Sequence, residues 1–188
     1  MLNFLNTKLF WRIWLGGFAA PLIAAHLTVA FAFEAQPAQL PKSIRQHLNR
    51  KYHAWKFPLI EQEIHQWMKQ RRARPEFTSG DFDGDGLRDY AVFIVYGKPE
   101  ARKTSVIAFL RRETGWKTHR LETRLAGDES LPTICFLGLA KKGTRDYDYQ
   151  RDRKFTYRHD AIFSGIFEKA GVSYVYWKGR FWQITTSD

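Results

Sequence analysis

The chain is poor in cysteine and lacks the short motifs of common catalytic sites. Its 188 residues include one cysteine, Cys135, so no intramolecular disulfide can form. The patterns Gly-x-Ser-x-Gly, His-Glu-x-x-His, Cys-x-x-Cys and Gly-x-x-x-x-Gly-Lys do not occur. The sequence therefore gives no support to a serine hydrolase elbow, a zinc protease, a dithiol redox site or a P-loop. We expect Cys135, in an apolar segment, to be a small buried residue rather than a reactive thiol.

Residues 1–32 have the layout of a secretory signal peptide. Lys8 and Arg12 are their only charges, an apolar run follows, and Ala30-Phe31-Ala32 supplies a small-x-small cleavage site. We predict cleavage after Ala32, leaving 33–188 as a single domain, monomeric, periplasmic or secreted, with no transmembrane span. The run is also nearly long enough for an uncleaved membrane anchor, which is the alternative.

Acidic residues are scarce relative to basic ones. The chain has 19 Asp and Glu against 30 Lys and Arg, a formal net charge of +11. A basic exported protein can simply have a solvated cationic surface, or it can bind an anionic envelope polymer or lipid. Another envelope protein is a further possible partner. We expect no nucleic acid partner, because an exported protein rarely meets one.

The most informative stretch is an aspartate-rich loop. Asp81, Asp83 and Asp85 occupy alternate positions, Gly86 follows them, and Asp89 stands three residues later. Ca²⁺ takes six to eight oxygen ligands, and a glycine at the sixth position of such a loop permits the sharp turn. An EF-hand would need a bidentate Glu at residue 92, which is valine, and the following 89–96 segment is typical of a strand. The stretch is therefore not an EF-hand.

This stretch resembles the calcium loop of FG-GAP and VCBS-type repeats of integrin-like propellers. Their pattern is a glycine, then Asp-x-Asp-x-Asp-Gly-x-x-Asp, then a hydrophobic strand, and the resemblance covers residues 80–96. It implies Ca²⁺ and a β-hairpin setting, and it implies nothing about catalysis. It also implies a ligand set made of four side chains and one backbone carbonyl: Asp81, Asp83, Asp85, Leu87 and Asp89. The pattern occurs once, and 33–188 is too short for a multi-bladed propeller.

Three other interpretations of the loop stay open. Asp and Gly also dominate ordinary turns, where basic side chains could offset the repulsion between aspartates. Mg²⁺ is an alternative to Ca²⁺. Residues 81–85 superficially resemble the nucleophile loop of haloacid-dehalogenase-like phosphatases, although no buried strand precedes them and a strand, not a helix, follows.

The remaining pattern predicts an α+β fold, with N-terminal helices packed on an antiparallel β-meander sheet. Apolar residues recur at helical spacing within 42–73, and 76–188 is mainly β. We predict seven strands, at 90–96, 105–111, 116–122, 134–139, 160–167, 173–177 and 180–185. The connection 141–160 is predicted to be an exposed charged loop, in which Tyr147 and Tyr149 could contact a ligand.

These patterns favour an exported, calcium-binding, non-catalytic structural or interaction module. The alternative is an envelope metal-dependent hydrolase of phosphoesterase type that uses the 81–89 cluster. In that case His119 or His159 would share a pocket with the aspartates.

Overall fold

The computed structural model describes residues 39–128 and 130–187, so the predicted signal peptide lies outside the described residues. Two α-helices, α1 (Lys42–Lys51) and α2 (Gln62–Gln70), precede the strands, and a short 3-10 helix, η1 (Pro99–Ala101), lies between β2 and β3. The strands are β1 (Phe77–Gly80), β2 (Asp89–Tyr96), β3 (Lys103–Arg112), β4 (Gly115–Leu125), β5 (Cys135–Ala140), β6 (Arg145–Asp148), β7 (Arg153–Thr156), β8 (Ala161–Ile166), β9 (Ala170–Trp177) and β10 (Arg180–Ser187).

Each helix buries one apolar stripe. Ile44 and Leu48 of α1 are fully buried, as are Ile64 and Met68 of α2, and a spacing of four residues places each pair on one helix face. The other positions of both helices are mostly polar and exposed. Neither helix approaches the length or hydropathy needed to cross a membrane, nor does any other helix of the described ranges.

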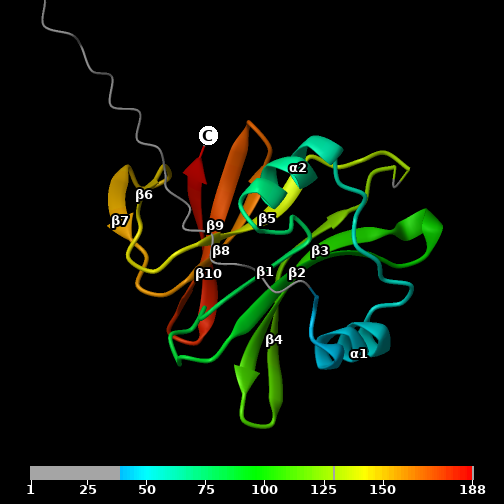
Figure 1. The fold of residues 1–188 in the computed structure, drawn as a ribbon, viewed down its shortest axis with the longest axis horizontal. Coiled ribbons are helices and arrows are strands. Elements are labelled where there is room, and N and C mark those ends of the chain that lie inside the picture. The colour runs from blue at the N-terminus through cyan, green and yellow to red at the C-terminus, as the bar shows by residue number, and fades with distance from the viewer. Residues whose placement is uncertain (1–38, 129, 188) are drawn as a thin grey trace, which may run out of the picture.

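The strands form two four-stranded antiparallel sheets and one separate hairpin. The first sheet has the order β1-β2-β3-β4, the second β10-β9-β8-β5, and β6 pairs only with β7 (Figure 1). The two sheets adjoin at β1 and β5, where the Leu137 N–H donates to the Pro75 carbonyl at 2.8 Å. This arrangement confirms the predicted α+β fold, with the difference that the strands divide between two sheets.

Strand β2 is buried on both faces, which explains its almost continuous apolar sequence. Val92 and Ile94 contact the stripe of α1, whereas Ala91 and Phe93 face the second sheet. Successive side chains of a strand point to opposite faces, so a strand covered on both sides needs apolar residues at nearly every position. The start of this strand, Asp89, is where the aspartate loop enters the core.

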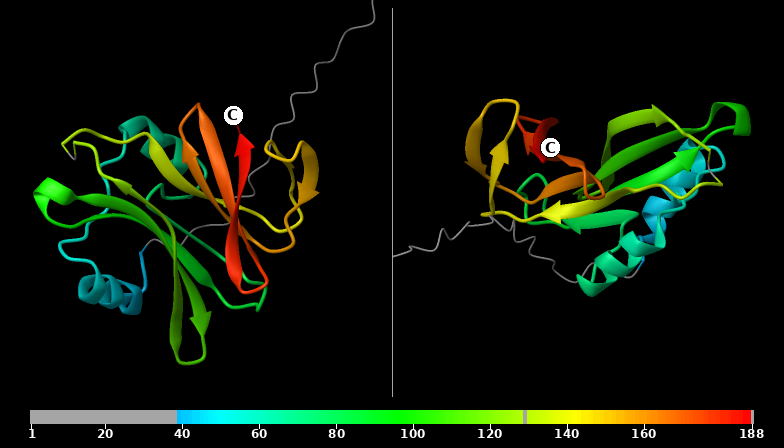
Figure 2. Two further views of the ribbon diagram at one scale, coloured as in Figure 1. Left: turned by 180° about the vertical axis from the view of Figure 1, so that it is seen from behind. Right: turned by 90° about the horizontal axis from the view of Figure 1, so that it is seen from above.

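The main core lies between the facing surfaces of the two sheets, and the helices lie outside it. Leu137, Leu139, Ile162 and Tyr174 of the second sheet pack against β2 and β3 of the first. Helix α1 packs on the outer surface of the first sheet and α2 on that of the second. The view from above shows both helices on one side of the strands (Figure 2).

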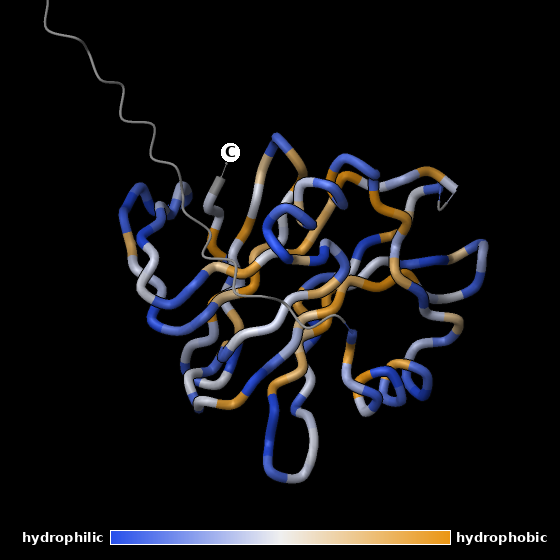
Figure 3. The backbone as a smooth tube through the Cα atoms, in the orientation of Figure 1, coloured by the Kyte–Doolittle hydropathy of each residue, from blue (hydrophilic) through white to orange (hydrophobic). Residues whose placement is uncertain are grey.

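The segment 141–160 was predicted as an exposed charged loop; many of its residues are exposed, but the prediction of a loop was wrong. Its central part is the β6–β7 hairpin, in which Asp148 is 1% exposed and Tyr157, just after β7, is 2% exposed. The Tyr157 hydroxyl donates to Asp146 Oδ2 at 2.6 Å and shares a 2.7 Å hydrogen bond with the Ser173 hydroxyl. These polar contacts, together with a small apolar cluster in which Phe155 and Tyr157 pack with Ala140 and Val175, hold this hairpin on the second sheet. It therefore appears as a polar protrusion in the hydropathy trace (Figure 3).

Candidate metal centre

The aspartate loop connects β1 to β2 and is anchored at both ends. Gly80 and Asp89 are direct partners in the antiparallel ladder, so they close the loop at its base. Phe82 is fully buried in the core between the sheets, which fixes the first turn of the loop. Gly84 and Gly86 have φ angles of +81° and +83°, values that glycine adopts without steric cost. The loop is thus a defined turn fixed to the core.

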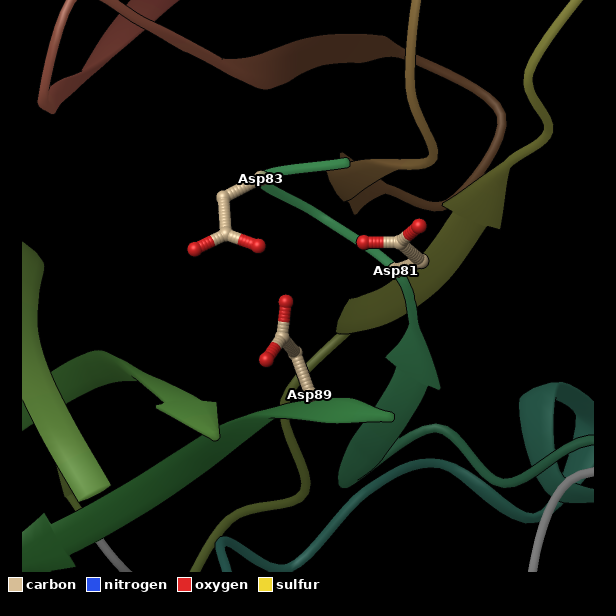
Figure 4. Close-up of side chains that lie close together, drawn as sticks. All are labelled: Asp81, Asp83 and Asp89. Atoms are coloured by element: carbon tan, nitrogen blue, oxygen red, sulfur yellow. The ribbon is translucent and has the colours of Figure 1, made fainter. Parts of the chain in front are cut away.

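Three carboxylates converge inside this turn. One oxygen each of Asp81, Asp83 and Asp89 lies within 4.8 Å of the other two (Figure 4). The Asp81 carboxylate also accepts the N–H groups of Gly84 at 2.8 Å and Gly86 at 3.0 Å. These two bonds wrap the loop around Asp81 and leave lone pairs on both of its oxygens for a further ligand.

Asp89 is the most deeply placed member of the cluster. Its side chain is fully buried, and its two oxygens accept the N–H groups of Phe82 at 2.9 Å and Arg111 at 2.7 Å. Burial raises the pKa of Asp89 to about 7, and the charges of Asp83 and Asp85 act in the same direction, while the two backbone donors oppose the shift. A cation beside the three carboxylates would favour the ionised form.

Asp83 is the member with unsatisfied bonding capacity. Its side chain is 6% exposed, and its Oδ2 is 2.5 Å from Arg112 Nη2. Its Oδ1 is buried and has no hydrogen-bond partner within the described part of the chain. Leaving a buried acceptor without a partner costs about 1–3 kcal/mol, and more for a charged group. A bound cation would supply the missing partner.

The negative charge of the loop is only partly compensated. Arg112, at the end of β3, contacts Asp83 through Nη2 and Asp85 Oδ2 through Nη1 at 3.0 Å. One guanidinium thus faces a loop that carries four aspartates. The resulting excess of negative charge in a partly buried turn favours a divalent cation.

A segment from the second sheet supports the loop from outside. Asp160 Oδ2 accepts the Asp81 N–H at 3.2 Å, and the Asp160 N–H donates to the Asp81 carbonyl at 3.1 Å. Asp160 Oδ1 accepts the Lys142 N–H at 3.0 Å, and Lys141 Nζ lies 3.5 Å from Oδ2. A Cβ on Gly80 would lie 2.7 Å from Asp160 Oδ2, so only glycine allows this approach. Asp160 therefore joins the loop to the second sheet.

His159 packs directly against the turn. A Cβ at Gly84 would lie 2.1 Å from His159 Nδ1, so Gly84 is needed for space as well as for its φ angle. His159 and Asp160 also line a pocket of about 260 Å³, and its lining includes none of the four loop aspartates. His119 lies on β4, where its ring contacts Tyr176 and Phe181 edge-on. Of the two histidines considered from sequence, the structure brings His159 to the loop.

No family model, curated protein or solved structure matches this chain significantly. The kind of ligand that this candidate metal centre can bind is therefore inferred from its own side chains. A group of convergent carboxylates at the end of a sheet can hold a hard cation, because such ions prefer oxygen ligands.

The structure groups three of the five sequence-predicted ligand residues. Asp81, Asp83 and Asp89 form the cluster, which could hold a metal ion. Asp85 is outside it and uses its oxygens for the Leu87 N–H, at 2.9 Å, and for Arg112. A ligand role for Asp85 and for the Leu87 carbonyl stays a prediction.

Sequence reasoning missed two residues that act on the centre. Arg112 was visible only as half of a basic pair, Arg111-Arg112, and nothing in the spacing pointed to the loop. Asp160 is 79 residues from Asp81 and carried no local pattern. Both reach the loop through sheet pairing, which a single sequence does not reveal.

Proposed function

We propose that the loop binds Ca²⁺ and that the protein is an exported, non-catalytic structural or interaction module. The observation that carries the metal proposal is the convergence of Asp81, Asp83 and Asp89 around a buried Asp83 oxygen that lacks a partner. The resemblance of residues 80–96 to FG-GAP and VCBS-type loops supports the same ion.

Ca²⁺ fits this centre better than Mg²⁺. Ca²⁺ accepts six to eight oxygens at 2.3–2.6 Å in variable geometry, whereas Mg²⁺ requires a near-ideal octahedron and retains several waters. Asp85 and the Leu87 carbonyl would add ligands from a turn that two glycines keep adaptable. For Asp85 to bind the ion, its contact with Arg112 has to open, so the guanidinium and the cation compete for the same charge.

The ion would stabilise the junction of the two sheets. Asp81 is tied through Asp160 to the segment that begins β8, and Asp89 is tied through its backbone donors to the end of β3. Fixing these carboxylates around an ion would therefore restrain three separate parts of the chain. Part of the binding free energy would become folding free energy.

Thermal unfolding of the purified protein in EDTA, in Ca²⁺ and in Mg²⁺ tests the proposal. An ion at a hundred times its dissociation constant adds about 2.7 kcal/mol to the free energy of unfolding, so we expect a Ca²⁺-selective rise of about 5–10 °C. Asp83→Asn should abolish the rise. Asp152→Asn, a matched change in the turn of the β6–β7 hairpin, should retain it. A melting temperature that no divalent cation changes would show that the loop is an ordinary turn neutralised by Arg112.

A further inference from the structure

The β6–β7 hairpin and the outer face of β9 and β10 enclose a hollow lined by cationic and aromatic groups. The hairpin is held on this face by the Tyr149 N–H, which donates to the Thr185 carbonyl at 3.0 Å. The hollow is the pocket of about 260 Å³ described above, and Arg153, Phe155, Arg158 and Trp177 contribute to its walls. Apolar and cationic groups therefore meet in one concave surface.

A second, more basic hollow lies along the same segment. It has a volume of about 710 Å³, and its lining contains Lys142, Arg153, Lys154 and Arg158 but no acidic residue. All four of these side chains are exposed. Arg153 and residues 155–158 line both hollows, so Arg153 and Arg158 belong to both of them, whereas Lys142 and Lys154 line the second. We call the two hollows together the basic groove.

The acidic residues beside the basic groove already have partners. Asp148 is 1% exposed, and its Oδ2 lies 2.9 Å from Arg151 Nη1, against 3.9 Å from Arg153 Nε. Asp160 is bound to the aspartate loop and to Lys141. The cations of the groove therefore produce a local positive potential, which attracts an anionic ligand.

Exposed tryptophans extend the surface beyond the groove. Trp177 is 44% exposed and its ring centroid lies 4.8 Å from the Arg158 guanidinium, and Trp182 is 40% exposed and lies 3.7 Å from Arg180. Trp177 pairs directly with Arg180 in the ladder, and strand alternation places Trp182 on the same face. An exposed indole offers a flat apolar surface on which the C–H face of a sugar ring can stack, while the adjacent cation binds an acidic substituent.

We propose that the basic groove binds an acidic polysaccharide, whose carboxylates pair with Lys142, Arg153, Lys154 and Arg158 while a sugar ring stacks on Trp177. This inference names the partner class of the interaction role proposed above and does not require the metal. A polymer fits better than a small anion, because the cations are spread over two adjoining hollows. A lipid surface fits less well, because Arg153 and Arg158 line a hollow of about 260 Å³ rather than a flat face.

Calorimetric titration with decagalacturonate tests the inference. The buffer contains EDTA, so that Ca²⁺ neither crosslinks the polymer nor occupies the aspartate loop, and a failure here stays separate from a failure of the metal proposal. We expect binding of decagalacturonate and none of its fully methyl-esterified form. Replacing two cations, in Arg153→Gln/Arg158→Gln, should weaken binding by about tenfold, since an exposed ion pair contributes up to about 1 kcal/mol.

Three further variants distinguish binding in the basic groove from non-specific attraction to a positively charged protein. Lys51→Gln/Lys69→Gln removes the same charge from the exposed ends of α1 and α2 and should leave the affinity within about twofold, since it touches no groove residue. Trp177→Ala should weaken the binding of decagalacturonate but not of polyphosphate, which has no sugar ring. Trp177→Phe, which retains a ring, should bind more tightly than Trp177→Ala, and unchanged thermal melts exclude misfolding as the cause.

Several outcomes would overturn the inference. They are the absence of decagalacturonate binding, equal losses in the groove and helix variants, or an affinity that Trp177→Ala leaves unchanged. Preferential binding to phosphatidylglycerol vesicles, again lost in Arg153→Gln/Arg158→Gln, would assign the groove to a lipid surface instead.

Discussion

Arg112 Nη2 lies 2.5 Å from Asp83 Oδ2, so the arginine already neutralises part of the negative charge that a metal ion would need. The same guanidinium contacts Asp85, which the loop pattern places among the ligands. If the loop binds a cation as proposed, Arg112 competes with that cation for the negative charge of Asp83 and Asp85.

Replacing Arg112 should change both the stability of the folded chain and the binding of Ca²⁺. We expect Arg112→Gln to lower the melting temperature in EDTA, because Asp83 and Asp85 lose their ion-pair partner. The same change should tighten Ca²⁺ binding by up to about thirtyfold, since a unit charge and a divalent cation about 4 Å apart repel each other by about 2 kcal/mol in water. Calorimetry in low salt measures both quantities. Arg124→Gln, which breaks the pair with Glu122 elsewhere on the first sheet, is the control. Weaker Ca²⁺ binding by Arg112→Gln would mean that the arginine assists the ion.

Asp160 should be necessary for the loop without binding the ion itself. Asp160→Ala removes the acceptor of the Asp81 and Lys142 N–H groups, and we expect a loss of about 2 kcal/mol in unfolding free energy. Urea unfolding in EDTA measures this loss. Asp160→Asn should recover part of it, because its amide oxygen can accept one of the two bonds. Asp152→Ala, in an exposed turn, should cost less than half as much. Equal losses of unfolding free energy in Asp152→Ala and Asp160→Ala would argue that Asp160 does not link the aspartate loop to the second sheet.

The parts of the fold that were predictable from sequence are those in which burial imposes a regular spacing of apolar residues along the chain. Strand β2 is apolar throughout because α1 and the second sheet cover its two faces, and the stripes of α1 and α2 repeat every four residues. Such patterns depend only on local geometry. The two helices and seven strands followed from them.

The β6–β7 hairpin and the partners of the aspartate loop depend on contacts between distant segments. The hairpin rests on polar contacts such as Tyr157 with Asp146, which produce no hydrophobic period. Likewise, the aspartate loop was recognisable because its aspartates lie close in sequence, whereas Arg112 and Asp160 come from β3 and from the segment before β8. Pairing of strands across the fold brings these groups together, and no spacing in one sequence encodes it.

At the two loop glycines, the cost of a steric clash with an added Cβ can be separated from the cost of the left-handed backbone conformation. Gly84 and Gly86 both have positive φ, but a Cβ meets the His159 ring only at Gly84. Gly86→Ala should cost about 1–2 kcal/mol of unfolding free energy from the left-handed conformation alone. Gly84→Ala should cost more, because its Cβ also meets the His159 ring. Adding His159→Ala should reduce the cost of Gly84→Ala to about that of Gly86→Ala, and it should leave the cost of Gly86→Ala unchanged. Urea unfolding of the double-mutant cycles measures this coupling. Additive losses in the cycle with Gly84→Ala would show that His159 moves aside freely.

His119 should make stability depend on pH independently of any metal. Its Nε2 is buried without a hydrogen-bond partner among the described residues, beside the rings of Tyr176 and Phe181. Burial lowers the pKa of His119, with Lys117 and Arg112 acting in the same direction and Asp83 opposing them. The unfolded chain therefore binds more protons at this histidine just below the unperturbed pKa of about 6.5, so the contribution of His119 to the unfolding free energy falls as pH drops below that value. Asp89, whose pKa is raised to about 7, takes up a proton in the folded chain over the same range and acts in the opposite direction, so the effect of His119 is measured as a difference between variants. Urea unfolding in EDTA between pH 7.5 and 5.5 should show that the unfolding free energy of His119→Phe, relative to that of the unmodified protein, rises as pH drops. His65→Gln, on the exposed face of α2, should follow the unmodified protein, whereas the same behaviour in His119→Phe would exclude this histidine as a source of the pH dependence.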